Sequence, residues 1–70
     1  MNKKVASFKY NGRSYEIDKL LDSETKEGFV YDLFDVTGVG AVSLAHFGMS
    51  HGVTEAELVE EAKRELELLV

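Results

Sequence analysis

Residues 4–18 read KVASFKYNGRSYEID, and this stretch decides how the fold begins. Asn11-Gly12 is the preferred dipeptide of a two-residue type I′ turn, because both of its positions adopt positive φ. Such a turn fixes the register of the two strands that it joins. It gathers the aromatic and aliphatic side chains on one face, in the pairs Ala6 with Ile17, Phe8 with Tyr15 and Tyr10 with Arg13. The polar face pairs Lys9 with Ser14 and Ser7 with Glu16. The sequence therefore predicts a β-hairpin whose apolar face must pack against another element.

The C-terminal residues 54–69 read TEAELVEEAKRELELL and predict an amphipathic helix. Thr54 and Glu57 have the spacing of a capping box, which indicates where the helix begins. Apolar residues then recur at helical spacing and form one stripe. We expect this stripe to face the core; it consists of Leu58, Val59, Ala62, Leu66, Leu69 and Val70.

The middle of the chain fits two structures. Four apolar residues of residues 24–36 have helical spacing, namely Phe29, Val30, Leu33 and Phe34. As a strand, the same segment would place an aspartate among the apolar residues of each face. Against a helix, the segment is rich in β-formers and Gly28 weakens helices. Residues 39–49 are apolar on nearly every side, which is typical of a buried helix and of a buried strand alike.

We therefore predict an α+β fold, in which an N-terminal β-hairpin packs on about three helices. The alternative is a four-stranded antiparallel sheet with one C-terminal helix. With 70 residues, the chain is expected to form a single small domain over residues 1–70. A domain of this size buries only about 60% of the surface that its unfolded chain exposes. Good local structure, self-association or a partner must then supply stability.

Composition excludes several classes of protein. Hydrophobic residues make up 44% of the chain and charged residues 30%, which is ordinary for a globular protein. The absence of cysteine excludes a disulfide scaffold, a thiolate metal site and a cysteine nucleophile. No stretch approaches the roughly 20 apolar residues that span a bilayer. After the N-terminal lysines only Val5 and Ala6 follow as an apolar stretch, whereas a signal peptide needs roughly 7 to 15 apolar residues. We therefore expect a cytoplasmic protein without membrane contact.

Few residue patterns in the chain carry chemistry. His46 and His51 are five residues apart, so they do not share a helix face as an i, i+4 zinc pair does. Ser50 neighbours His51 only in sequence, whereas a nucleophile needs a base and an orienting group in space. Asp32 and Asp35, one turn apart on a helix, are expected to lie on a solvated face. We therefore expect no enzymatic activity, no metal site and no cofactor.

Charge is unevenly distributed along a chain whose net charge is −5. Five of the eight basic residues lie within residues 1–19, whereas six of the 13 acidic residues are glutamates of residues 54–70. A basic hairpin is one way to enter a nucleic-acid groove. An acidic protein nevertheless repels phosphate, so direct nucleic-acid binding is the third of our hypotheses. The second is an acidic charge-mimic inhibitor of a nucleic-acid-binding protein.

The first hypothesis is a small acidic, non-catalytic protein-interaction module that acts as an adaptor, a subunit or an inhibitor. Its partner is expected to be another protein or a second copy of this chain, as a homodimer. On the last helix, Glu60 has the i, i+4 spacing that pairs it with Arg64. Leu68 falls outside the apolar stripe and projects on the polar side. The predicted partner site consists of Glu57, Glu60, Glu61, Arg64 and Leu68.

Overall fold

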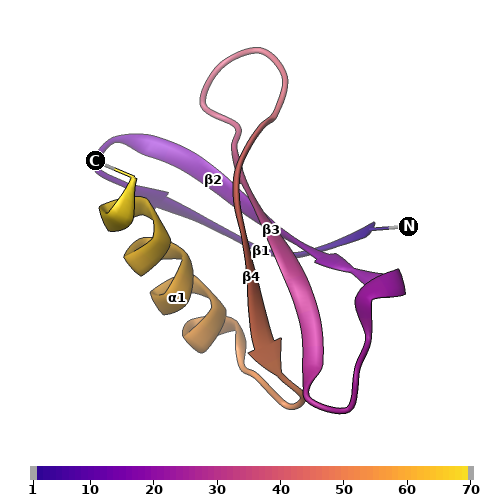
Figure 1. Cartoon of the computed structure of the whole chain (residues 1–70). Coiled ribbons are helices and arrows are strands. Elements are labelled where there is room, and N and C mark those ends of the chain that lie inside the picture. The colour runs from indigo at the N-terminus through magenta and orange to yellow at the C-terminus, as the bar shows by residue number, and fades with distance from the viewer. Residues whose placement is uncertain (1, 70) are drawn as a thin grey trace.

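The computed structural model describes residues 2–69 and contains four strands and one α-helix. The strands are β1 (Asn2–Tyr10), β2 (Arg13–Leu20), β3 (Gly28–Asp35) and β4 (Val42–Ser50), and they form one antiparallel sheet in chain order. A short 3-10 turn, η1 (Leu21–Ser23), follows β2. Helix α1 (Glu55–Leu68) packs on one face of the sheet, and the loop between β3 and β4 projects beyond the sheet (Figure 1).

The predicted N-terminal hairpin is confirmed, together with its register. Asn11 and Gly12 have φ angles of 51° and 79°, as a type I′ turn requires. All five predicted cross-strand pairs are present between β1 and β2. The register shifts once, between Lys4 and Ala6, so that β1 carries a β-bulge at Val5.

The prediction that the hairpin packs on about three helices is wrong, and the alternative of a four-stranded sheet with one C-terminal helix is confirmed. Residues 28–35 and 42–50 are strands, in keeping with their β-forming side chains. Gly28 marks the start of β3 because the β4 backbone lies against it. A Cβ atom at this position would stand 1.9 Å from the Met49 carbonyl oxygen, so only glycine fits.

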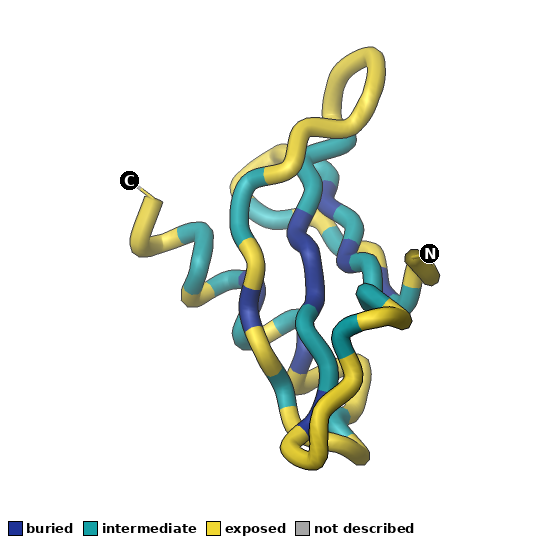
Figure 2. Tube along the Cα trace, turned by 45° about the vertical axis from the view of Figure 1, so that its right-hand side comes forward, coloured by how far each residue is buried: buried dark blue, intermediate teal, exposed yellow. Residues whose placement is uncertain are grey.

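The core is built on a row of residues that crosses the sheet on the face that carries the helix. Ala6, Ile17, Leu33 and Ala45 are successive cross-strand partners from β1 to β4. Ile17 and Leu33 are 0% exposed. Leu58 and Ala62 of α1 belong to the same buried cluster. Figure 2 shows the buried residues concentrated in the middle of the sheet, whereas the projecting loop is exposed.

Helix α1 begins where the sequence predicts. The Thr54 side chain accepts a hydrogen bond from the Glu57 backbone N–H (3.2 Å), and Glu57 Oε1 accepts one from the Thr54 backbone N–H (2.9 Å). This is a complete capping box. The apolar stripe is confirmed for its first four residues, two of them buried and two partly buried: Leu58, Ala62, Val59 and Leu66. It is wrong for Leu69, which is 56% exposed, and Val70 lies outside the described residues.

The central row yields a test of the fold. Leu33→Ala should lower the free energy of unfolding by about 2 to 5 kcal/mol, because it removes fully buried methyl groups and leaves a cavity. Urea denaturation followed by circular dichroism measures the loss. Val39→Ala in the fully exposed loop is the control and should leave the midpoint unchanged. Equal midpoints for both variants would contradict the placement of Leu33 beneath α1.

Candidate functional site

The acidic side of α1 carries a shallow groove that continues to β4. Five of its lining residues come from α1 and one, Met49, comes from β4; the helix residues are Ala56, Glu57, Glu60, Glu61 and Arg64. Four of the five residues of the predicted partner site therefore line one groove, which we call the α1 groove. Leu68 does not line it, although its side chain is 78% exposed near the end of the helix.

Two of the acidic groove residues are held by neighbours. Glu57 belongs to the capping box, and the hydrogen bond from the Thr54 backbone N–H lowers the pKa of its carboxyl group. Glu61 Oε1 accepts a hydrogen bond from Arg64 Nη1 at 2.6 Å. The i, i+4 pair predicted between Glu60 and Arg64 is therefore replaced by an i, i+3 pair with Glu61. These contacts fix the positions of both carboxylates along the groove.

Glu60 is the groove carboxylate that is left for a partner. It is exposed, and it makes no ion pair with any of residues 2–69. The groove thus holds three carboxylates against one guanidinium, and that guanidinium is engaged by Glu61. A negative groove with an apolar end at Met49 can bind a cationic side chain and contact its aliphatic stem.

The strand that ends the α1 groove is also an edge of the sheet. Among the described residues, β4 has a strand neighbour on one side only, which is β3. Its nine residues contain no Asp, Glu, Lys or Arg. The other edge strand, β1, carries three lysines and a bulge, which are the features by which proteins block unwanted strand pairing. β4 has a bulge near Leu44 but no charged side chain, so it is the less protected edge.

A second polar cluster lies on the open face of the sheet, opposite α1. Lys4, Asp18, Asp32 and His46 are successive cross-strand partners from β1 to β4. Asp32 is 7% exposed; it accepts a hydrogen bond from Ser43 Oγ at 2.8 Å, and its Oδ2 lies 3.5 Å from His46 Nε2. Directly opposed like charges destabilise a sheet. Burial, and then the charges of Glu16 and Asp32, raise the pKa of Asp18.

Asp32 and Asp35 lie in strand β3 and not on a helix. The expectation that both lie on one solvated helical face is therefore wrong. Asp35 binds Arg13 Nε at 2.7 Å across the β2–β3 pair. Its hydrogen bonds from Thr37 and from Arg13 lower its pKa to about 2. The two aspartates point to opposite faces of β3 and form no catalytic pair.

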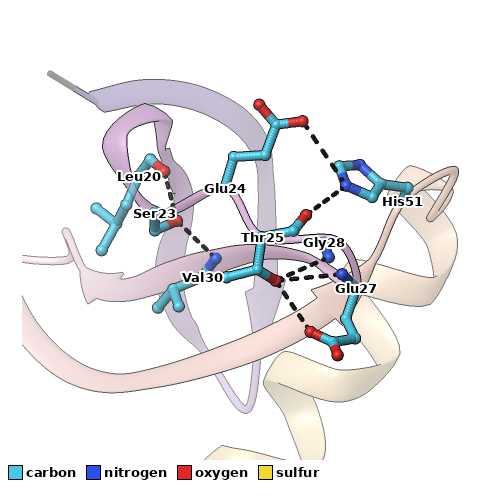
Figure 3. A network of polar contacts seen from close by, with 8 residues as sticks. All are labelled: Leu20, Ser23, Glu24, Thr25, Glu27, Gly28, Val30 and His51. Atoms are coloured by element: carbon cyan, nitrogen blue, oxygen red, sulfur yellow. Dashed lines mark hydrogen bonds and ion pairs between the residues drawn. The ribbon is translucent and has the colours of Figure 1, made fainter.

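His51 has a structural role. Its Nε2 lies 2.9 Å from the Thr25 carbonyl oxygen, so this nitrogen donates the hydrogen bond (Figure 3). Thr25 Oγ1 in turn accepts hydrogen bonds from the backbone N–H groups of Glu27 and Gly28. The β2–β3 connection is thereby tied to the turn before α1. Among residues 2–69, no group of three or more His, Cys, Asp or Glu side chains is placed to hold a metal ion.

No family model matches this chain, and no curated protein or solved structure is significantly similar to it. Within the described part of the chain, no helix is long and apolar enough to cross a bilayer.

The open face yields a test of electrostatics. Because the pKa of Asp18 is raised in the folded state, its ionised form costs stability at neutral pH. Asp18→Asn should therefore raise the free energy of unfolding at pH 7. The gain should disappear as the pH falls through the raised pKa, because the folded wild type then takes up the proton. Thermal unfolding across a pH series measures the difference.

Asp35→Asn is the matched control and should have the opposite sign. The pKa of Asp35 is lowered from 3.8 to about 2, so the ionised form stabilises the fold above that range. The variant should be less stable than the wild type at pH 7. This difference should shrink as the pH falls from about 4 to about 2, where the wild type loses the same contribution. If both variants shift stability in the same direction, the placement of these two carboxyl groups is incorrect.

Proposed function

We propose that this protein is a small non-catalytic interaction module that binds a partner protein along the α1 groove. The observation that carries the proposal is the gathering of three carboxylates and Met49 in one groove beside an uncharged edge strand. Exposed charge of one sign speeds encounter with an oppositely charged partner and selects against others. An apolar residue and a strand edge within reach add the contacts that slow dissociation.

The shape of the groove favours a protein partner over a small molecule. Small-molecule sites are concave and bury most of their ligand. The α1 groove is instead formed by side chains that stand on the outer side of a helix, and Ala56, Glu57, Glu60 and Arg64 are all exposed. Such a surface suits the side chains of a protein that lies across it.

The charge-mimic hypothesis has less support from the arrangement of charges. Lys63 and Arg64 interrupt the glutamates of α1. Asp18 and Asp32 lie on the open face of the sheet and do not extend the acidic surface of the helix. Nucleic-acid binding through the hairpin has less support as well, because Lys4 is engaged by Glu16 at 3.2 Å.

The groove is tested by site-specific photocrosslinking. A photoreactive amino acid replaces the exposed Ala56 in the groove, and a second protein carries it at Asn11 in the hairpin turn. Both are exposed to an extract of the cells that make the protein. We expect a protein that crosslinks from position 56 and not from position 11, and binding that weakens as salt is added. Crosslinks that are the same from both positions would contradict a partner in the groove.

The partner identified by crosslinking is then purified without the crosslink. Glu60→Lys should weaken its binding to this protein about fivefold, which corresponds to the loss of roughly 1 kcal/mol of surface electrostatics. Glu16→Lys makes the same change of charge on the open face and should leave the affinity unchanged. Isothermal titration calorimetry measures both. Equal affinities for the two variants would place the partner elsewhere.

A further inference from the structure

The backbone of β4 has a set of hydrogen-bonding groups that point away from the sheet, and the hydrogen bonds at its end identify them. The His51 N–H donates to the Glu27 carbonyl oxygen, so these two residues form a hydrogen-bonded pair of the antiparallel ladder. Hydrogen-bonded and non-hydrogen-bonded pairs alternate along such a ladder. Following the β3–β4 register, the backbone N–H and C=O groups of Ala45, Phe47 and Met49 therefore point toward β3.

The remaining residues of this part of β4, namely His46, Gly48 and Ser50, then direct their N–H groups to the free edge, and His46 and Gly48 direct their C=O groups there as well. The Ser50 carbonyl oxygen is already engaged, because it accepts a hydrogen bond from the Val53 N–H at 3.3 Å. The β2–β3 pair supports this phase, because the Val36 N–H donates to the Ser14 carbonyl oxygen. The backbone N–H and C=O groups of even-numbered β3 residues therefore point toward β2, and those of odd-numbered residues point toward β4. A strand placed about 4.8 Å beyond β4 would meet three outward N–H groups, at every second residue, and the outward C=O groups of His46 and Gly48.

We propose that β4 pairs with an extended segment of the partner protein, which adds a fifth strand and alternates basic with apolar side chains. This inference rests on the proposed function, because it names the chemistry of the partner at the same surface. Strand addition obtains affinity from main-chain hydrogen bonds and specificity from pockets for alternate side chains. The charge of the α1 groove and the shape of the open face define those two sets of side chains.

On the helix side, every second side chain of the added strand would project beside Met49 and toward the α1 groove. Lys and Arg fit this position because their long stems can lie on Met49 while their heads reach the groove carboxylates. Arg64 is already engaged by Glu61. Glu57 is held in the capping box, so Glu60 is the carboxylate that meets the incoming charge.

On the open side, the alternate side chains would meet a depression at the end of the sheet. It is lined mainly by apolar atoms, and Gly48 contributes no side chain to fill it; the other lining residues include Val30, Phe29 and Ser50. An apolar side chain of the added strand fits there. Basic residues facing the helix and apolar residues facing the other way give the segment an alternating sequence.

A second copy of this chain fits the edge less well. Self-pairing through β4 would bring together two chains that each carry a net charge of −5 and the same acidic groove. A second copy offers β4 itself, which has no lysine or arginine for the groove carboxylates. The lysines of a second copy lie on β1, the edge strand whose charges and bulge oppose strand pairing. Charge complementarity therefore favours a basic segment from another protein.

The test uses a displayed library of random peptides of about ten residues, the upper length of an ordinary strand, selected on the immobilised full chain. We expect enriched peptides in which Lys or Arg alternates with apolar residues. Amide hydrogen exchange should show new protection at His46, Gly48 and Ser50 when such a peptide is bound. Failure to enrich any peptide over bare support, or enrichment of acidic peptides, would overturn the proposal.

Two variants at one position separate backbone pairing from side-chain contacts. His46→Pro removes an outward N–H without breaking a β3–β4 hydrogen bond, and proline is tolerated at such edge positions. His46→Ala removes the same side chain but keeps the N–H. We expect the proline variant to bind the selected peptides at least about tenfold more weakly than the alanine variant. Equal affinities would overturn strand addition.

Ser50→Pro and Ser50→Ala provide the same comparison if His46→Pro does not fold by circular dichroism.

Charge is tested by Glu60→Lys, which should weaken peptide binding, and by Arg64→Ala, which should strengthen it because it releases Glu61. If the proline variants have no effect but Glu60→Lys still weakens binding, the strand proposal fails while the α1 groove function stands. If neither matters, both fail. A dimer by light scattering, with protected edge amides before peptide is added, would assign β4 to a second copy and overturn the proposal.

Discussion

The contact between Ile17 and Leu33, across β2 and β3 and beneath α1, is the interaction on which the structure depends. Both side chains are fully buried, and Ala6 and Ala45 flank them in the same row. Large residues lie at the centre of this row and small ones at its sides, and the single helix of 14 residues packs mainly on β1 and β2. Because there is only this one helix among the described residues, the opposite face must remain compatible with water.

The polar character of the open face follows from that one-sided cover. Side chains alternate between the two faces of a strand, so Asp18 and Asp32 must point away from α1 when Ile17 and Leu33 point toward it. Their direct opposition is unfavourable, and Lys4, His46 and Ser43 offset it from both sides. The strand order leaves β4 at an edge of the sheet, and it is there that we propose another strand binds.

The sequence was sufficient for the elements whose signals are local. The Asn11-Gly12 turn predicts the hairpin register residue by residue, and the Thr54–Glu57 box predicts where α1 begins. The helical prediction for the middle of the chain is wrong because the aspartates of this segment count against a strand only if each lacks a partner. Asp35 binds Arg13, and Asp32 binds Ser43. These partners come from other strands, which periodicity within one segment does not reveal.

The wrong prediction of helices in the middle of the chain also limits how much of the α1 groove the sequence predicts. The glutamates and Arg64 were identified from the helix alone, because a capped amphipathic helix shows its polar side in the sequence. Met49 and the β4 edge were missed because residues 39–49 were expected to form a helix. The signal that was available is the absence of charge over residues 42–50, next to lysines on the other edge strand. The strand order is needed to interpret this difference in charge, because it shows that both segments are edge strands.

Amide hydrogen exchange of the free protein along β4 is the most direct test of this account. A strand at an unoccupied edge should show alternating protection, because only every second amide is bonded to β3. We predict slow exchange at Ala45, Phe47 and Met49 and fast exchange at His46, Gly48 and Ser50. Uniform protection of all six amides would contradict the account, because it would mean that this edge is already covered or that the segment is not an edge strand.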